Sequence, residues 1–197
     1  HANNNSGNAL EFTVLDEFGT PFTICFKKSN AARVVYRMAL GKAVKTKGFC
    51  TDVYTDAALE FIGKGTEKPF FVYLPTNAPH GPYHDVPEDL RQHYMTKDLT
   101  ALQANPPKGE RKAQMQDQLA RIAAMITNED QNVGRVMAYL VKNGLLKNTL
   151  VIRMNDNGPN TMRYVGEMRG MKTNVHEGGV RSPFWMHWPT KIRAGTK

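Results

Sequence analysis

Apolar residues recur along the chain at spacings that predict two helices. From Val53 to Phe61 they lie three or four positions apart, which predicts an amphipathic helix that ends near Gly63. A longer stripe of apolar residues predicts a second helix over residues 113–143. Gly144 follows directly and is placed to end that helix in a left-handed conformation.

Two short, continuous apolar runs, residues 69–74 and 148–154, predict buried strands. Each run follows a predicted helix and precedes a turn-rich loop. This order predicts an α/β layered fold with a largely parallel central sheet flanked by helices. Ligands in such folds bind outside the carboxyl ends of the strands, so we expect the chemistry in the loops after Leu74 and Met154.

The first part of the chain carries weaker patterns. It predicts strands near residues 12–15 and 21–26 and a short helix over residues 31–40. We leave residues 1–40 unassigned and place the recognisable domain at residues 41–197. Because the chain begins with a histidine and no signal segment follows, we expect it to be part of a longer protein and its domain to be incomplete.

The composition is that of an ordinary globular chain, and no apolar run reaches the roughly 18 residues that a membrane span needs. A net charge of +8 would suit a polyanionic partner. The positive charges are dispersed and no recognition motif accompanies them, so we predict no nucleic-acid partner. Cys25 and Cys50 allow one disulfide without requiring it, and their spacing is not that of a metal site.

The turn after the second apolar run contains Asp156 and Asn157. Carboxylate and amide oxygens are hard ligands that suit calcium or magnesium. Gly158 permits the turn that two neighbouring ligands need if they are to converge on one ion. Taken alone, these residues favour a simple tight turn over a metal site.

Two further residues are candidates for binding an anion. His80 lies between Pro79 and Pro82, which fix the backbone, so its imidazole could donate to an anion or act as a general acid. A loop histidine bonded to a nearby carbonyl is the alternative, and His84 is a weaker candidate. Lys172 lies among glycines and could bind a tetrahedral anion as a point charge, although a solvated surface lysine is the commoner outcome.

In their order along the chain, these segments resemble the sulfatase family, of the arylsulfatase type within the alkaline-phosphatase-like superfamily. The resembling segments are Gly48-Phe49-Cys50-Thr51-Asp52-Val53, Pro75-Thr76-Asn77-Ala78-Pro79-His80-Gly81-Pro82, Asp156-Asn157-Gly158, Met168-Arg169-Gly170-Met171-Lys172 and Glu177-Gly178-Gly179-Val180-Arg181. The resemblance covers about residues 41–197. It implies an alkaline-phosphatase-like fold and a sulfuric ester hydrolase that cleaves sulfate esters of sugars or aryl alcohols.

The resemblance also implies roles for the candidate residues. Asp156 and Asn157 correspond to two calcium ligands. His80 corresponds to the histidine that contacts the sulfate ester and assists departure of the leaving group. Lys172 corresponds to the lysine that binds sulfate oxygens. A metal, a lysine and a histidine around one group of oxygens would stabilise charge in the transition state.

Sulfatases attack sulfur with a hydrated formylglycine, made from the first residue of a motif Cys or Ser, any residue, Pro or Ala, any residue, Arg. Neither Cys25 nor Cys50 begins this motif. The segment Ser29–Arg33 fits it formally but lies closer to His80 than in the family, and we interpret it as a chance match. The family's first calcium-binding aspartates have no counterpart, so we predict that this chain alone is inactive.

Two other functions remain open from the sequence. One is a phosphodiesterase or phosphonate hydrolase of the same superfamily, because the candidate residues would bind either tetrahedral anion. The other is a non-catalytic binder of sulfated glycans. The expected partner is a sulfated small molecule or glycan. The habit of the family suggests a secreted, periplasmic or lysosomal location, and the sequence gives no oligomeric state.

Overall fold

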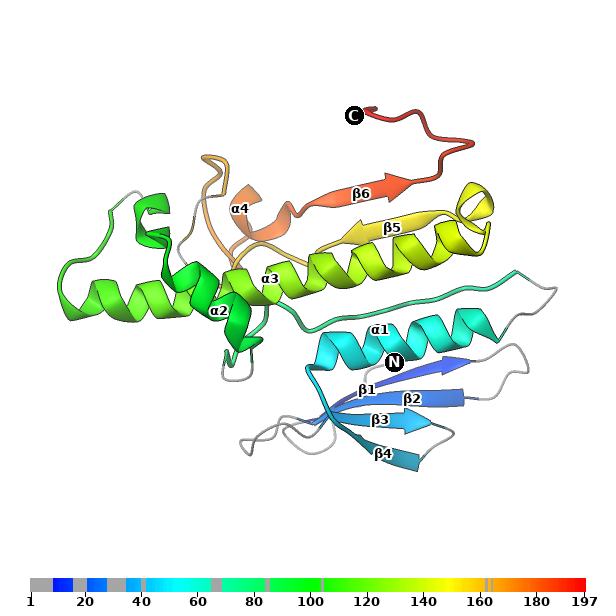
Figure 1. Cartoon of the computed structure of the whole chain (residues 1–197). Coiled ribbons are helices and arrows are strands. Elements are labelled where there is room, and N and C mark those ends of the chain that lie inside the picture. Colours follow the sequence, from blue (N-terminus) through cyan, green and yellow to red (C-terminus); the bar gives the residue numbers. More distant parts are fainter. Residues whose placement is uncertain are drawn as a thin grey trace. The chain divides into compact units, whose positions relative to one another are not determined.

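The structure is a computed structural model. It describes residues 9–15, 21–27, 35–39, 42–64, 69–83, 86–103, 105–161, 163 and 165–197, with side-chain surroundings described from residue 46 onward. The chain divides into two compact units. The first comprises residues 1–90 and 124–132, and the second comprises residues 91–123 and 133–197. Figure 1 labels their helices and strands.

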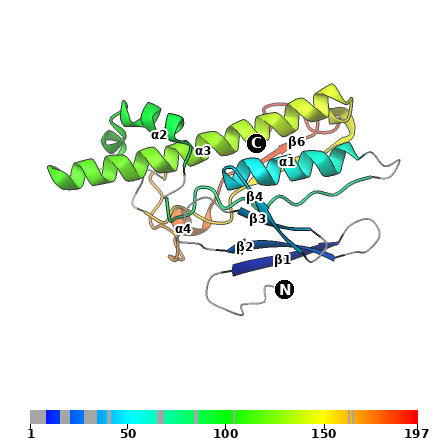
Figure 2. The same cartoon turned by 60° about the horizontal axis from the view of Figure 1, so that its bottom comes forward.

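The first unit begins with two antiparallel pairs of strands. β1 (Ala9–Leu15) pairs with β2 (Pro21–Lys27), and β3 (Val35–Ala39) pairs with β4 (Lys42–Thr46). Figures 1 and 2 show β2 beside β3. The strands predicted near residues 12–15 and 21–26 are therefore confirmed.

The helix predicted over residues 31–40 is wrong for the part that the structure describes, since residues 35–39 form β3. Val35 and Tyr36 begin this segment, and β-branched and aromatic residues favour a strand. Pairing with β4 gives that preference its hydrogen-bonding partner. Residues 31–34 and 40 lie outside the described residues.

Helix α1 (Cys50–Gly63) follows these strands and confirms the first predicted helix. The apolar side chains that it buries make up part of the core of the first unit, and the last three of them lie four positions apart: Val53, Tyr54, Ala58 and Ile62. A segment of helix α3, residues 124–132, belongs to the same unit and contributes buried Ala124 and Met125. Both α1 and this segment of α3 therefore contribute to the core of the first unit.

The strand predicted over residues 69–74 is not observed. In this segment Phe71 and Tyr73 are exposed while the residues between and beside them are half-buried, which is the alternation of a strand. However, it forms no ladder with any described strand. A strand is stabilised by its ladder of hydrogen bonds, and an apolar run by itself does not supply the partner.

The longest helix, α3 (Glu110–Lys142), confirms the second predicted helix, and its residues outside 124–132 belong to the second unit. Gly144 has φ of 69°, as predicted for a left-handed helix end, and Leu145 donates its N–H to the Leu140 carbonyl at 2.8 Å. The other helical elements are α2 (Glu88–Met95), η1 (Leu99–Leu102), η2 (Leu146–Asn148) and α4 (Glu177–Val180).

Strand β5 (Val151–Met154) confirms the later half of the second predicted strand. It pairs with β6 (Phe184–His187) in antiparallel register, with Arg153 opposite Trp185. All strand pairs among the described residues are antiparallel, whereas we predicted a largely parallel sheet. A parallel neighbour reaches β5 only through a crossover, and residues 69–74, the preceding strand in the predicted order, lie in no described ladder.

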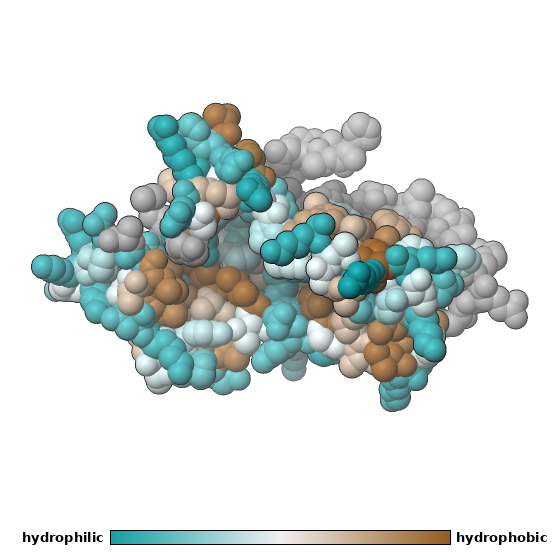
Figure 3. All heavy atoms as spheres, turned by 90° about the horizontal axis from the view of Figure 1, so that it is seen from above, coloured by the Kyte–Doolittle hydropathy of each residue, from teal (hydrophilic) through white to brown (hydrophobic). Residues whose placement is uncertain are grey.

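The β5–β6 pair leaves much apolar surface exposed. Figure 3 shows hydrophobic surface interspersed with hydrophilic surface on the face that it views. The large apolar side chains that are exposed on these two strands are Ile152, Met154, Phe184, Trp185 and Met186. No helix in the described part of the chain is both long and apolar enough to cross a membrane.

Candidate functional site

The end of β5 is fixed by three hydrogen bonds to Asn155. The backbone N–H of Asn155 donates to Pro183 at 3.2 Å, and its carbonyl accepts from the Ser182 hydroxyl at 2.6 Å. Arg153 donates to the amide oxygen of Asn155 at 2.7 Å. Asn155 thus remains attached to the strand pair, and the chain turns only after it. Asp156 is the first residue of that turn.

The loop that contains Asp156 and Asn157 is joined by its backbone to the loop that contains Lys172. Gly158 donates its N–H to the Gly179 carbonyl at 2.9 Å, and Lys172 donates its N–H to the Pro159 carbonyl at 2.8 Å. Both bonds lie within the second unit. The structure therefore brings together the predicted metal ligands and the predicted anion-binding lysine on two adjoining loops.

The glycines of these loops are required by the close approach of one backbone to the other. A Cβ at Gly158 would lie 1.9 Å from the Gly178 carbonyl oxygen. A Cβ at Gly179 would lie 2.3 Å from the Asn174 carbonyl oxygen. The structure shows that Gly158 allows the two loops to pack together and that Gly179 allows close packing within the loop of Lys172.

Two charged side chains on these loops, those of Asp156 and Lys172, have no partner among the described residues. Among the described residues, neither the Asp156 carboxylate nor the Lys172 ammonium makes a hydrogen bond or an ion pair. Asp156 is exposed, whereas Lys172 is half-buried. Asn157 donates its side-chain amide to the Gly158 carbonyl at 2.8 Å, which leaves its amide oxygen as an acceptor. The loops thus offer two hard oxygens and one cation.

Lys172 lies in a tight turn closed by Asn174. The side-chain oxygen of Asn174 accepts from the Met171 N–H at 3.1 Å, and the Asn174 N–H donates back to the Met171 carbonyl at 2.9 Å. Thr173 is left with φ of 75°, in the left-handed region that β-branched residues rarely adopt. The hydrogen bonds of Asn174 therefore fix the backbone at Lys172, and the backbone of Thr173 is strained as a result.

His80 lies in the first unit, in the loop after the unpaired apolar segment. Its backbone N–H donates to the Asn77 carbonyl at 2.7 Å, and its Nδ1 lies 2.6 Å from the Gly81 carbonyl oxygen. A carbonyl only accepts, so Nδ1 carries the hydrogen and Nε2 remains for another partner. The sequence left open whether this histidine bonds a carbonyl or an anion. The geometry allows both, because Nδ1 bonds the Gly81 carbonyl and Nε2 is left for an anion.

The structure places the four predicted residues unevenly. Asp156, Asn157 and Lys172 lie on adjoining loops of the second unit, and His80 belongs to the first. The weaker candidate His84 and the segment 29–33 lie outside the residues that the structure describes. The assignment of catalytic, sulfate-binding and metal-binding roles stays a prediction.

The donor set fits a calcium ion in part. Calcium takes six to eight oxygen ligands, and Asp156 and Asn157 supply two from consecutive residues of one turn. In the described part of the chain there is no cluster of three or more histidine, cysteine or acidic side chains. These two residues would fit one side of a calcium shell, and the calcium site stays a prediction.

Cys50 begins α1 and is a free thiol. Burial raises the pKa of this thiol above its ordinary value, which disfavours the thiolate. The disulfide that the sequence allowed is therefore not formed at Cys50. The side chain of Cys25 lies outside the described surroundings.

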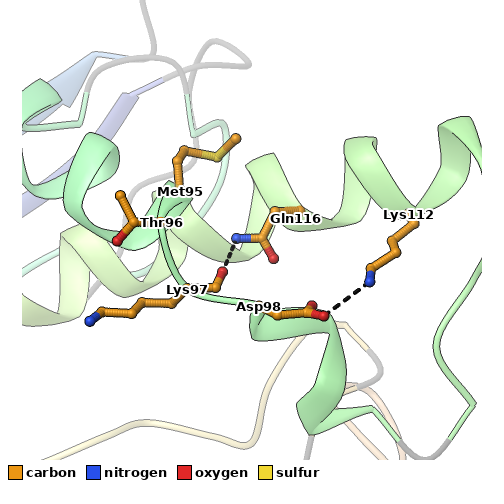
Figure 4. Close-up of a pocket in the computed structure, with 6 residues that line it drawn as sticks. All are labelled: Met95, Thr96, Lys97, Asp98, Lys112 and Gln116. Atoms are coloured by element: carbon orange, nitrogen blue, oxygen red, sulfur yellow. Dashed lines mark hydrogen bonds and ion pairs between the residues drawn. The ribbon is translucent and has the colours of Figure 1, made fainter.

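A separate depression of about 300 Å³ lies between α2 and α3 in the second unit (Figure 4). It is lined by Met95, Thr96, Lys97, Asp98, Lys112 and Gln116. Lys112 pairs with Asp98 at 3.0 Å, and hydrogen bonds from the Thr100 hydroxyl and Lys112 lower the pKa of Asp98. None of the predicted site residues lines it. No spacing in the sequence indicated this depression, because its residues come from three separate elements.

Known proteins match this chain over most of its length. The family model described as Sulfatase matches residues 4–197. The uncharacterized sulfatase YdeN of Escherichia coli is 28% identical over 77% of this chain and 25% of its own length. Mouse N-acetylgalactosamine-6-sulfatase is 29% identical over 74% of this chain and 25% of its own length. The chain thus spans about a quarter of the length of these relatives.

A solved structure agrees with the sequence comparison. The crystal structure of Ps i-CgsB in complex with k-i-k-neocarrahexaose has a TM-score of 0.62 and 30% identity, over 79% of this chain and 31% of that one. This likeness confirms the alkaline-phosphatase-like fold as an incomplete domain. The boundary that we predicted at residue 40 stays a prediction. Because the family model covers nearly the whole chain, the chain belongs to the sulfatase family.

Proposed function

We propose that the protein containing this chain hydrolyses sulfate esters, with Asp156, Asn157 and Lys172 forming part of the site. The observation that carries the proposal is the pair of hydrogen-bonded loops in the second unit. They hold the Asp156 carboxylate, the Asn157 amide oxygen and the Lys172 ammonium. Within the described part of the chain, neither charged group makes an ion pair or a hydrogen bond. Membership of the sulfatase family supports sulfate ester hydrolysis in general.

Lys172 would bind the oxygens of the sulfate group. Its ammonium is a compact point charge that suits a tetrahedral anion, and its half-buried position reduces competition from water. Asp156 and Asn157 would hold calcium, which when bound supplies positive charge to the sulfate oxygens. The expected result is stabilisation of the charge that develops as the ester bond breaks.

His80 would assist departure of the leaving group. Since Nδ1–H is directed to the Gly81 carbonyl, Nε2 is the nitrogen that would deliver a proton to the ester oxygen. The ring must be doubly protonated before that transfer. The hydrogen bond to Gly81 keeps the imidazole in one orientation while it gains and loses that proton.

The attacking group is not assigned to any residue of this chain. The family's attacking group is a formylglycine, and neither cysteine begins its motif. Burial raises the pKa of the Cys50 thiol, which also argues against direct attack by that sulfur. We therefore expect no turnover by residues 1–197 alone.

A sulfated sugar is the substrate class that we favour. One relative carries the name N-acetylgalactosamine-6-sulfatase, and one structural neighbour was solved with a neocarrahexaose. The net charge of +8 would favour the approach of an anionic glycan. An aryl sulfate is the simpler test substrate because its product is easily measured.

The proposal is tested by assaying the complete gene product on an aryl sulfate, an aryl phosphate and sulfated sugars. We expect turnover of sulfate esters and a loss of about 100-fold in kcat/KM for Lys172→Ala. Lys191→Ala, an exposed lysine of the same unit, is the matched control and should keep wild-type activity.

Other outcomes identify the alternatives. Faster turnover of the aryl phosphate would favour a phosphodiesterase or phosphonate hydrolase. Binding of sulfated glycan without turnover would favour a non-catalytic binder. Turnover by residues 1–197 alone would contradict the expectation that the attacking group is missing.

A further inference from the structure

The loop that carries His80 is tied to helix α3 by a hydrogen bond between two side chains. Thr76 donates its hydroxyl to a carboxylate oxygen of Glu129 at 3.0 Å. Both residues belong to the first unit. Glu129 is only 7% exposed, and a hydrogen bond to a carboxylate is stronger away from water.

The direction of the Glu129 carboxylate is fixed by a buried network next to it. Asn128 and Asn132 both donate their side-chain amides to Asp52 of α1, at 2.9 and 2.7 Å. Asn132 also donates to the Asn128 carbonyl at 2.9 Å. The two asparagines are 6% and 3% exposed. This network sets the rotation of α3 against α1, and therefore sets where Glu129 points.

On the loop side, little conformational freedom separates Thr76 from His80. Pro75 precedes the threonine, Pro79 precedes the histidine, and each proline fixes one backbone angle. The N–H of His80 is bonded to the Asn77 carbonyl at 2.7 Å. A shift of Thr76 would therefore be passed on to the imidazole instead of being absorbed within the loop.

We propose that Glu129 is a positioning residue that acts through Thr76 to hold the imidazole of His80 in place for departure of the leaving group. The inference rests on the proposed function, in which His80 assists that step. Glu129 itself need not touch the substrate. Loss of the Thr76–Glu129 bond should therefore lower kcat and leave KM nearly unchanged.

The bond is tested in the complete gene product with variants that remove or retain its donor and acceptor. Thr76→Val keeps the side-chain shape and removes the donor, and we expect kcat on a sulfated sugar to fall about 10-fold with KM within about twofold. Thr76→Ser restores the hydroxyl and should restore kcat. Glu129→Leu should match Thr76→Val, and the double variant should lose no more than either one, because both remove the same bond.

The dependence on the leaving group separates positioning from a general loss of structure. A phenol of low pKa departs without much help from an acid, whereas a sugar hydroxyl needs that help. The loss caused by Thr76→Val should therefore be about 10-fold for the sulfated sugar and within about twofold for an activated aryl sulfate. A merely structural defect would lower both rates equally.

Thr100→Val is the matched control. The Thr100 hydroxyl also donates to a carboxylate, that of Asp98, but it belongs to the second unit, whereas the His80 loop belongs to the first. The same chemical change there should leave kcat unchanged. If the circular dichroism spectrum shows that Thr76→Val does not fold, Thr76→Ala replaces it. The same changes in kcat, KM and leaving-group dependence are then expected.

His80→Asn separates failure of this inference from failure of the proposed function. Wild-type kcat for Thr76→Val alongside an inactive His80→Asn would overturn the positioning role and leave the proposed function standing. Full activity of His80→Asn would overturn the role of His80 and the positioning role with it. Equal losses on both substrates would also overturn the positioning role.

Discussion

Lys172 donates its backbone N–H to the carbonyl oxygen of Pro159 at 2.8 Å. This bond joins the turn that carries Lys172 to the loop that begins with Asp156 and Asn157. A cation and a pair of hard oxygen ligands, separate in sequence, are thus placed on two loops that share a backbone contact.

Gly158→Ala should destabilise the two loops. The new Cβ would lie 1.9 Å from the Gly178 carbonyl oxygen, which is backbone and cannot move alone. We expect a loss of about 2–4 kcal/mol in unfolding free energy, measured by urea denaturation. Gly134→Ala in α3 is the control, since nothing lies within 4 Å of its Cβ. That variant should be more stable than wild type by up to about 1 kcal/mol. Equal effects of the two variants would contradict the close packing described here.

Thr173→Gly should stabilise the turn that carries Lys172. Thr173 has φ of 75°, a conformation that costs a residue with a Cβ about 1–2 kcal/mol. Glycine removes that cost but loses more entropy on folding, so the net gain should be about 0.5–1 kcal/mol. Thermal unfolding measures the change. Thr173→Ala retains the Cβ and should give no such gain, so a gain from alanine equal to that from glycine would argue against strain.

Asp117 should contribute stability that disappears in acid. Arg91 donates to its carboxylate at 2.8 Å and Arg121 at 2.7 Å. Burial raises the pKa of Asp117, but the hydrogen bonds from Arg121 and Arg91 outweigh it and hold this pKa below its ordinary value. Because the folded pKa is the lower one, the contribution is complete above the unfolded pKa of about 3.9 and is lost as pH falls through the folded value.

The measurement is urea denaturation of wild type and Asp117→Asn between neutral pH and pH near 2. We expect the variant to be about 1–2 kcal/mol less stable at neutral pH, a value reduced by the partial exposure of the pair. The difference should shrink in acid. Asp130→Asn provides a comparison at an exposed aspartate of α3. A difference that does not change with pH would mean that the charge of Asp117 is not what stabilises the unit.

Calcium should stabilise the protein through Asp156. At a calcium concentration 100 times the dissociation constant, binding to the folded state alone adds about 2.7 kcal/mol. We expect a chelator to lower the thermal midpoint of wild type and to change that of Asp156→Ala much less. Asp130→Ala, an exposed aspartate on α3, should respond to the chelator as wild type does. No effect of the chelator on wild type would argue against a calcium site.

The sequence predicted α1 and α3 well because each has a repeating apolar face that packs within the chain, whereas the short helix that it predicted over residues 31–40 was wrong where the structure describes it. α1 and α3 were both expected within a few residues of their observed bounds. Strand pairing was predicted poorly, because the sequence of a strand does not determine which other segment it pairs with. Residues 69–74 have the apolar pattern of a strand but lie in no described ladder. Residues 35–39, which we predicted as part of a helix, pair with β4.

The sequence selected the candidate site residues, and their roles stay predictions. Asp156, Asn157 and Lys172 stood out by residue type and by neighbouring glycines, and the structure places them on adjoining loops. The bond between Thr76 and Glu129 could not be foreseen, since it joins positions 53 residues apart with no periodic relation. Burial of Glu129 depends on how α3 packs, and helical periodicity alone does not select which acidic residue is enclosed.

The contact between the two loops has a thermodynamic consequence. A cation bound at Asp156 and Asn157 would restrict the motion of one loop, and the Gly158–Gly179 and Lys172–Pro159 bonds would pass that restriction to the other. Anion binding at Lys172 would then cost less conformational entropy, because the bound cation has already ordered part of that loop. Linkage requires the effect to be mutual, so sulfate should tighten calcium binding by the same factor by which calcium tightens sulfate binding.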